Sequence, residues 1–307
     1  MELRQLEFFV HVAELGSFTR ASNFLSVAQP VLSRNVRALE VEFRQVLLER
    51  NGRGVTLTEA GKRFLEHGRS VLAQIERARL DMEEGRGAFT GRLVVALPPS
   101  VSHALTAPLV RAFRSHFPGA TLCVLEGLST NILEWLTIGR VDCAVVYTVP
   151  TSIGVDLVPV LSEQLHLVSR RSDRDCLERS VSDDISLAEV ARKTLVMPSR
   201  PHSIRMLVEG TMAQASLKPQ IELEVESIPA ILTLVRSEEL HAILSLKAVH
   251  SSGRIDDFTV RPIRSPTLET MLWIATSAQR PRGPLLNQVV PMLQDLLLDL
   301  WSIKQPA

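Results

Sequence analysis

Residues 29–43, QPVLSRNVRALEVEF, have the pattern of a helix with two unlike faces. Pro30 falls in the first turn, where its missing N–H costs least. Apolar side chains at spacings of three and four predict a buried stripe of Leu32, Val36, Leu39 and Phe43. The opposite face carries Ser33, Arg34 and Arg37, which can form hydrogen bonds. One face is therefore expected to pack on a core and the other to meet a partner.

The segments around this helix predict a winged helix-turn-helix over residues 1–57. A first helix carries Leu3, Leu6, Phe9, Val10 and Ala13 at helical spacing. Gly16 ends it, and Ser17 can cap a second helix carrying Phe18, Ala21, Phe24 and Leu25. After residue 43, a turn at 50–54 separates the apolar runs Val46–Leu48 and Val55–Leu57, which predicts a two-stranded wing.

This arrangement predicts binding to double-stranded DNA. An α-helix fits the major groove, and the N-terminal part of the second helix of such a motif contacts base edges. Glutamine can pair with adenine and arginine with guanine, while serine and threonine suit phosphate. The predicted DNA-binding residues are Ser17, Thr19, Gln29, Pro30, Ser33, Arg34, Arg37, Arg50 and Arg53.

The alternative is that Arg34 and Arg37 only form a solvated helix face. Residues 1–60 hold seven basic and seven acidic side chains, so charge alone gives no strong footprint for nucleic acid. The ordered set of helices, turns and an arginine-containing wing favours DNA binding.

Residues 58–84 predict one long helix of about 40 Å. Its apolar positions alternate spacings of four and three, as in a coiled-coil seam. They are Phe64, Gly68, Val71, Ile75, Ala78 and Met82. A partner helix would cover this seam, although the helix can also pack on its own domain. Gly85-Arg86-Gly87 then predicts a hinge.

From residue 92 onward, strand-like and helical segments alternate, which favours a parallel α/β sheet. About 215 residues exceed one typical domain, so two α/β lobes with a cleft between them are expected. The predicted strands are 93–97, 121–125, 141–147, 165–169, 194–197, 221–225, 242–244, 258–263 and 271–276. The predicted helices include 132–139, 204–215, 228–236 and the final amphipathic helix 285–301.

The whole chain has 307 residues, 45% of them hydrophobic, with 34 basic and 34 acidic side chains. Three cysteines, Cys123, Cys143 and Cys176, do not form an even disulfide framework, so free thiols in a reducing compartment are expected. Neither a signal peptide nor an apolar run of about 20 residues is visible. A cytoplasmic protein without a membrane partner is therefore predicted.

Polar residues at predicted strand ends form a candidate effector site. A strand that runs into a helix start leaves N–H groups toward the cleft, which favours an anion or polar head group. The residues so placed are Ser100, Val101, Ser102, Ser129, Thr130, Tyr147, Thr148 and His202. Ser100 as a helix cap, Tyr147 as a core residue and His202 as a surface histidine are the open alternatives.

Catalysis is not expected. The eight histidines and three cysteines lack metal-ligand spacing, and nucleotide-binding or nucleophile motifs are missing from their usual contexts. We expect no catalytic residue, metal or cofactor. A solute-binding protein that only captures a small polar ligand is the rival to a DNA-binding regulator.

The first 65 or so residues resemble LysR-type transcriptional regulators. The matching stretches are 3–9, 16–21, 29–34, 39–40, 48–50 and 53–61, with looser matches at 117–118, 126–127, 139–142 and 226–227. The variant wing and residues 226–228 are similar to a subgroup tied to nitrogen metabolism. The resemblance implies a homodimer through the linker helix, often a homotetramer. It also implies an effector, such as a carboxylate or nitrogen metabolite, between two lobes of a periplasmic-binding-protein-like domain.

The resemblance adds Pro198 and Ser227 to the effector site and divides the chain. The DNA-binding domain is expected at 1–57, the linker helix and hinge at 58–87, and the effector domain at 88–307. Lobe I is expected at 88–162 and 266–307, and lobe II at 163–265. The sequence departs from the family at Ser22, at Phe43-Arg44 in place of a Leu-Gly turn, and at Glu238-Glu239, where a glycine turn is usual near the cleft.

Overall fold

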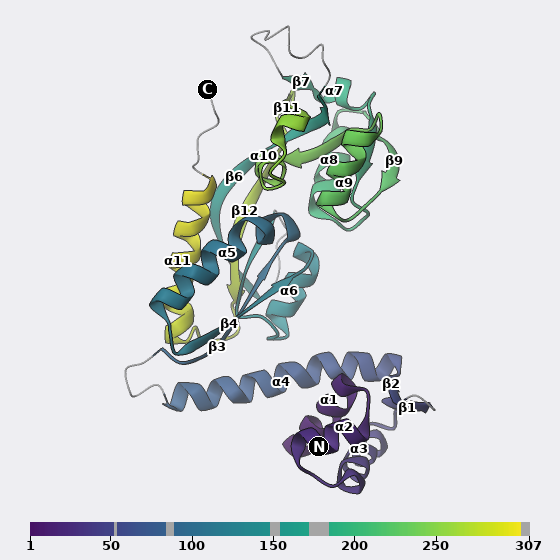
Figure 1. The fold of residues 1–307 in the computed structure, drawn as a ribbon, viewed down its shortest axis with the longest axis vertical. Helices are drawn as coiled ribbons and strands as arrows, with labels where there is room; N and C mark the ends of the chain where they lie inside the picture. Colours follow the sequence, from purple (N-terminus) through teal and green to yellow (C-terminus); the bar gives the residue numbers. More distant parts are fainter. Residues whose placement is uncertain (52–53, 84–88, 148–153, 172–183, 302–307) are drawn as a thin grey trace. The chain divides into compact units, whose positions relative to one another are not determined.

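The computed structural model describes residues 1–51, 54–83, 89–147, 154–171 and 184–301. The chain divides into two compact units, chiefly residues 1–88 and 89–307, which are drawn in Figure 1. The elements of the N-terminal unit are α1 (Leu3–Leu15), α2 (Phe18–Leu25), α3 (Gln29–Phe43), β1 (Leu48–Asn51), β2 (Gly54–Leu57) and α4 (Glu59–Glu83). Helices α1, α2 and α3, followed by the antiparallel β1–β2 hairpin, form a winged helix-turn-helix.

The core of this unit follows the predicted stripe of α3 except at Phe43. Leu32, Val36 and Leu39 are buried against α1, as their spacing predicts. Phe43 is 42% exposed, because it ends α3 and lies beside Phe64 of α4, with ring centroids 5.0 Å apart. Phe24, one of the apolar residues of α2, is 66% exposed.

Part of helix α4 packs against α1 of its own unit. Gly68 lies close to Val10 and Leu6 of α1, where a Cβ would meet side-chain atoms at 3.0 and 3.1 Å. Beyond this point Val71 is 38% exposed and Ala78 is exposed. Gly68 of the predicted seam therefore packs within the unit, whereas Val71 and Ala78 remain open to a partner.

The C-terminal unit contains one large sheet and a separate two-stranded sheet. Its strands are β3 (Gly91–Leu97), β4 (Ala120–Glu126), β5 (Cys143–Tyr147), β6 (Val155–Arg170), β7 (Ile185–Ser186), β8 (Thr194–Met197), β9 (Gln220–Glu224), β10 (Ala242–Ser245), β11 (Phe258–Arg264) and β12 (Glu269–Ser277). Its helices are α5 (Pro99–His116), α6 (Ser129–Thr137), α7 (Leu187–Val190), α8 (Ser203–Gln214), α9 (Ile228–Ser237), α10 (Leu246–His250), the 3-10 turn η3 (Ile255–Asp257) and α11 (Pro284–Trp301).

The sheet is mixed, which corrects the parallel prediction. Its order is β4-β3-β5-β12-β6-β11-β7, with β10 also paired to β6. Only β3–β4, β3–β5 and β11–β7 are parallel within it, because β12 returns antiparallel between β5 and β6. Strand β6 has 16 residues where a five-residue strand was expected, and it pairs with β12 at one end and with β10 and β11 at the other. The predicted lobe boundary at residue 162 falls inside this strand.

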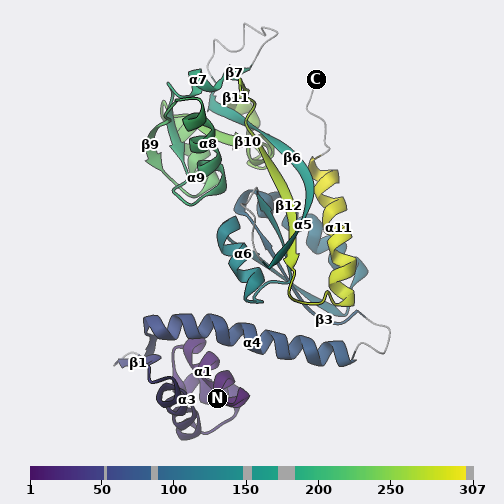
Figure 2. The ribbon, with the colours of Figure 1, turned by 180° about the vertical axis from the view of Figure 1, so that it is seen from behind.

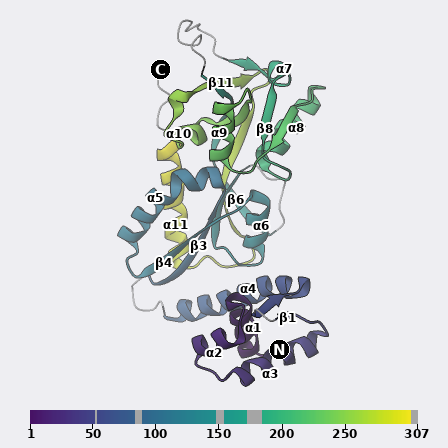
Figure 3. The ribbon, with the colours of Figure 1, turned by 45° about the vertical axis from the view of Figure 1, so that its right-hand side comes forward.

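Two α/β lobes arise on the two ends of β6 (Figure 2). In lobe I, α5 and α11 cover one face of the sheet and α6 covers the other (Figure 3). In lobe II, α8 packs with Leu165 and Leu167, whereas α9 packs with Val168 and Leu244 on the other face. The alternation of β6 side chains thus builds a core on each side of the strand.

Candidate functional site

The outer face of α3 is free for a partner. Gln29, Pro30, Arg34 and Arg37 are exposed, whereas the opposite stripe is buried. Within the described residues, the Arg34 guanidinium forms a hydrogen bond only to its own helix, where Nε donates to the Pro30 carbonyl at 3.4 Å. A long cation held this loosely can reorient toward a base edge or a phosphate.

Of the other predicted DNA contacts, Ser17, Thr19 and Ser33 lie within the described residues. Ser17 caps α2, since its Oγ accepts from the Arg20 N–H at 3.3 Å, while Thr19 is exposed in the first turn. Ser33 is half-buried. The side chain of Arg50 and all of Arg53 lie outside the described residues, so their predicted role in the wing is not addressed by the structure.

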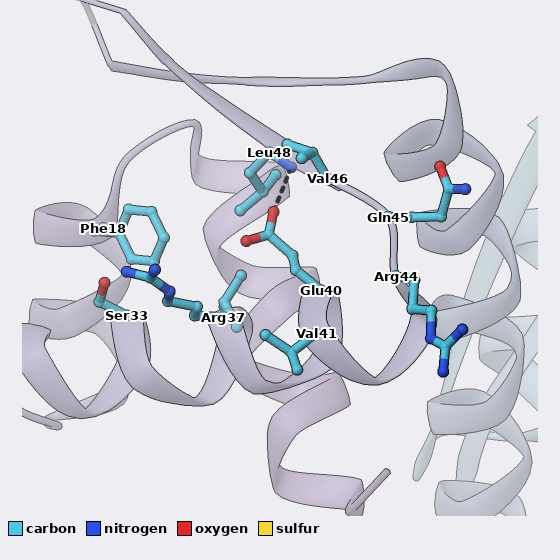
Figure 4. Close-up of a pocket in the computed structure, with 10 residues that line it drawn as sticks. Phe18, Ser33, Arg37, Glu40, Val41, Arg44, Gln45, Val46 and Leu48 are labelled. Carbon is cyan, nitrogen blue, oxygen red and sulfur yellow. Dashed lines mark hydrogen bonds between the residues drawn. The ribbon is translucent and has the colours of Figure 1, made fainter.

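A carboxylate joins α3 to the wing. Glu40 Oε1 accepts hydrogen bonds from the N–H groups of Leu47 at 2.9 Å and Leu48 at 3.1 Å. Figure 4 shows the groove of about 550 Å³ between α3 and the start of β1, lined by Ser33, Arg37 and Glu40 on the helix side. These bonds explain why β1 begins at Leu48, two residues later than expected, with Val46 left 61% exposed. Glu40 therefore fixes the wing against the helix that would read DNA, a role that sequence periodicity does not reveal.

The unusual Phe43-Arg44 pair ends α3 in a left-handed residue. Arg44 has φ 51° and ψ 37°, and its N–H bonds to the carbonyls of Glu40 and Val41. Glycine is the residue that adopts this conformation without steric cost. The chain therefore turns after α3 with an arginine, rather than a glycine, in the left-handed position.

The lobes of the C-terminal unit line a cavity and a larger groove. A cavity of about 290 Å³ is lined from both lobes, and we call it the interlobe cavity; its walls are Pro99, Ser100, Glu126, Gly127, Leu128, Asn131, Pro198, His202, Ile204, Glu226, Ile228, Ile243 and Leu244. A larger groove of about 1330 Å³ shares several of these residues and extends along α5 and α9. Of the predicted effector residues, Ser100, Pro198 and His202 line the interlobe cavity, while Ser102 and Ser227 line only the larger groove.

Ser100 belongs to a buried hydrogen-bond chain beneath the cavity. Its Oγ lies 2.7 Å from the Tyr147 hydroxyl, and the Tyr147 N–H donates to Ser129 Oγ at 3.1 Å. Burial raises the pKa of Tyr147 well above its usual value, so the phenol stays protonated. Tyr147 and Ser129 therefore lie behind Ser100 and help to hold it in the cavity wall.

Two further predicted residues, Val101 and Thr130, do not reach the interlobe cavity. Val101 is fully buried in the lobe I core, so its side chain cannot touch a ligand. Thr130 is exposed but belongs to neither set of lining residues. Thr148 lies outside the described residues.

Three carboxylates near the cavity were missed as site residues. Glu126 ends β4 and accepts from Ser102 Oγ at 2.6 Å, and Glu226 accepts from the Ser199 N–H at 3.1 Å. Glu163 of β6 is buried, accepts from Trp301 Nε1 at 2.9 Å, and has its pKa raised by burial. For Glu126 and Glu226 the available signal was their position directly after a strand, where ligands gather in open α/β sheets.

The loop 198–202 is held by a buried arginine. Arg205 donates from Nη1 to the Pro198 carbonyl at 3.1 Å and from Nε to Glu209 at 2.6 Å. At the end of this loop, His202 caps α8: its Nδ1 accepts from the Ile204 N–H at 3.3 Å. Burial lowers the pKa of His202 despite the nearby charge of Glu226, which favours the neutral ring.

The Glu238-Glu239 departure leaves the backbone unstrained. Both side chains are exposed, and φ is negative at the helix cap Glu238. No residue from 236 to 241 has a positive φ, so this turn does not require glycine. Neither carboxylate lines the interlobe cavity or the larger groove.

Other site classes find little support in the described part of the chain. Within it, no three His, Cys, Asp or Glu side chains converge as a metal site. Cys143 is buried, and burial raises the pKa of its thiol, which disfavours a reactive thiolate. Among the described helices, none has the length and apolarity to cross a bilayer.

Comparison with known proteins agrees with this architecture. Residues 3–62 match the family described as "Bacterial regulatory helix-turn-helix protein, lysR family", and residues 86–297 match the "LysR substrate binding domain". The nitrogen assimilation regulatory protein nac of Klebsiella aerogenes is 32% identical over 299 residues, covering 97% of this chain and 95% of that protein. A hydrogen peroxide-inducible genes activator of Haemophilus influenzae is 27% identical over 289 residues, covering 94% and 93%.

Solved structures show the same fold. Full-length CbnR in complex with its target DNA has a TM-score of 0.70 and 26% identity, covering 96% of this chain and 100% of that one. Full-length OxyR from Pseudomonas aeruginosa has a TM-score of 0.72 at 22% identity, covering 100% and 99%. These relatives are regulators rather than enzymes. With both of its parts matched, the chain belongs to the LysR family of DNA-binding transcription regulators, which carry an effector-binding domain.

Proposed function

We propose that the exposed face of α3 reads an operator in duplex DNA. Gln29 and Arg34 would contact base edges, with Pro30, Ser33 and Arg37 beside them. Ser17 and Thr19 at the start of α2, and Arg50 and Arg53 of the wing, would contact phosphates. The observation that carries this assignment is the contrast between exposed Gln29 and Arg34 and buried Leu32 and Val36 on one helix. The related CbnR has been solved in complex with its target DNA, which supports DNA binding by this chain.

The interlobe cavity is the proposed effector site. Its walls come from both lobes, so a ligand held there can favour one lobe arrangement over another. A ligand shifts such an equilibrium only by its different affinity for the two states. The similarity to a nitrogen assimilation regulator favours a small nitrogen metabolite as the effector, with transcriptional activation or repression of the genes that handle it.

The proposed assembly is a homodimer through α4, and a homotetramer formed from two such dimers. The exposed positions of the seam, Val71 and Ala78, support a helix partner. Pairing of α4 would place two α3 helices on one operator, as DNA readers with two-fold symmetry require. The work of such a protein takes place where the DNA lies, in the cytoplasm at the nucleoid.

A titration against the DNA upstream of its own gene tests the proposal. Binding is measured by gel shift at several salt concentrations, beside a DNA of scrambled sequence. Specific binding should weaken steeply as salt increases, because phosphate contacts release counterions. A solute-binding protein would give no shift even at low salt, and that result would contradict operator binding.

A further inference from the structure

The interlobe cavity is acidic. Glu126 reaches it from lobe I and Glu226 from lobe II, whereas its described lining contains neither lysine nor arginine. Glu126 and Glu226 also line the larger groove, where Arg111, Arg236 and Arg254 are found outside the lining of the interlobe cavity. The other polar residues of the cavity are Ser100, Asn131 and His202. The cavity itself defines the site, and its charge indicates what can occupy it.

Both carboxylates are held in place by neutral groups. Glu126 Oε1 accepts from the Ser102 hydroxyl at 2.6 Å. Glu226 Oε1 accepts from the Ser199 N–H at 3.1 Å and also from the Ser199 hydroxyl. No ion pair joins either carboxylate to a cation within the described residues. A serine fixes each group without cancelling its charge, so two oriented negative charges remain for a ligand.

The interlobe cavity offers few hydrogen-bond donors that could bind an anion. The first turn of α5 offers few donors, because Pro99 has no N–H and the N–H groups of Val101 and Ser102 both bond to the Pro98 carbonyl, at 3.0 and 2.8 Å. His202 uses Nδ1 as an acceptor for the Ile204 N–H, which leaves its other ring nitrogen as a neutral donor. The anion preference expected at this strand end is therefore not what the lining favours.

The remaining walls select an organic ligand over a metal ion. Leu128, Ile204 and Ile228 are apolar, as are Ile243 and Leu244. An inorganic cation needs several converging oxygen or nitrogen ligands, and the described residues do not form such a group of three. An ammonium on a short alkyl chain satisfies a carboxylate at one end and the apolar wall along its length.

We propose that the interlobe cavity binds a small organic cation, an alkyl amine or diamine whose ammonium groups pair with Glu126 and Glu226. This inference rests on the proposed function of the cavity as the effector site. A diamine engages one carboxylate from each lobe, so it binds best when the lobes are drawn together. That differential affinity is what an effector needs to change the state of the regulator.

Four probes of similar length and different charge test the inference on the full-length protein. They are 1,4-diaminobutane, butylamine, butane-1,4-diol and succinate, compared at constant ionic strength and pH 7. Trp135, Trp273 and Trp301 are the three tryptophans of the chain, and all lie in the C-terminal unit, so tryptophan fluorescence follows unfolding of that unit. Binding to the folded state raises its melting temperature. The diamine should raise it most and butylamine less, while the diol and succinate leave it unchanged.

Charge-removing variants locate the effect. Glu126→Gln and Glu226→Gln should each weaken diamine binding at least about tenfold, because each removes a charge-assisted hydrogen bond. Glu238→Gln is the matched control, since this exposed carboxylate of lobe II lies outside the cavity. Equal diamine binding by all three variants would overturn the inference, as would the absence of any response to either amine.

The outcomes separate this inference from the proposed function. If succinate or the diol stabilises the C-terminal unit and Ser100→Ala weakens that response, the cavity is an effector site for another class of ligand. The amine inference then fails and the proposed site stands. If an amine binds tightly, loses affinity in both glutamine variants and yet leaves DNA binding unchanged, the inference stands and the effector role fails.

Discussion

The two units of this regulator place their functional side chains in opposite ways. On α3, Gln29 and Arg34 are exposed and make few contacts within the chain. In the C-terminal unit, Ser100 is tied to buried Tyr147, and Pro198 is held by buried Arg205. A surface that reads DNA can be varied with little effect on folding. The walls of a ligand cavity are also part of a core, so function and stability are coupled there.

The largest expected effect lies at the buried arginine of lobe II. Arg205→Met should lower the free energy of unfolding of the C-terminal unit by about 3 kcal/mol, because it removes the buried donor of the Pro198 carbonyl and one of the two cations of Glu209. Its side chain is only 8% exposed and serves Glu209, Glu224 and the Pro198 carbonyl. Urea unfolding followed by tryptophan fluorescence measures the loss.

Arg200→Met is the matched control for that experiment. Arg200 also pairs with Glu209, at 2.9 Å, but its side chain is 68% exposed. Exposed ion pairs contribute about 0–1 kcal/mol. An equal loss in the two variants would mean that burial does not set the value of this cluster, and the proposed contrast between the units would weaken.

The next effect is confined to DNA binding. Arg34→Ala should weaken binding to the operator by about 1–3 kcal/mol if it reads a base, or about fivefold to 150-fold. The melting temperature should stay unchanged, because the side chain contacts only its own helix. Fluorescence anisotropy with labelled operator and scrambled DNA measures the preference.

Arg34→Lys then distinguishes a base contact from a phosphate contact. Lysine keeps the charge but lacks the planar fork that pairs with guanine. The salt dependence should therefore persist while the preference for the operator declines. Full preference in the lysine variant would place Arg34 on phosphate.

A smaller loss of stability is expected when the contact between Ser100 and Tyr147 in the C-terminal unit is removed. Tyr147→Phe and Ser100→Ala should each cost about 1 kcal/mol of unfolding free energy, the usual net value of one hydrogen bond. The double variant should cost less than the sum, since both remove the same 2.7 Å contact. Strictly additive losses, measured by urea unfolding, would show that this contact contributes nothing to stability.

The sequence predicted the N-terminal unit better than the effector site, for a physical reason. A helix face is determined by neighbours three and four residues apart, so the buried and exposed sides of α3 follow from spacing. The error there, Phe43, lies at the end of α3, where a side chain can leave the core. Glu40 was missed because its partners, Leu47 and Leu48, belong to the next element.

The interlobe cavity depends on contacts between residues that are far apart in the sequence. Ser100 meets Tyr147, and Ser102 meets Glu126, across 47 and 24 positions of the chain. The predicted strand was shorter than β6 because it was placed on the apolar run that begins at Leu165. Val158 and Pro159, which lie earlier in β6, are exposed. Position after a strand predicted Ser100 and His202, which line the interlobe cavity, but it also predicted Val101, which faces the core.

The smallest expected effect tests the strained end of α3. Arg44→Gly should stabilise the N-terminal unit by about 1 kcal/mol or less, because a left-handed residue with a Cβ costs about 1–2 kcal/mol and glycine returns part of that as greater freedom in the unfolded chain. Arg44→Ala is the control: it removes the same charge and side chain but keeps the Cβ at φ 51°, so no gain is expected. Hydrogen exchange of residues 29–51 in the full-length protein reports on this unit, which contains no tryptophan. A gain in both variants would mean that the arginine side chain, rather than the backbone, carries the strain. A gain in the glycine variant alone would establish that the recognition helix keeps its end despite an unsuitable residue, because the Glu40 and Val41 carbonyls hold the Arg44 N–H in place.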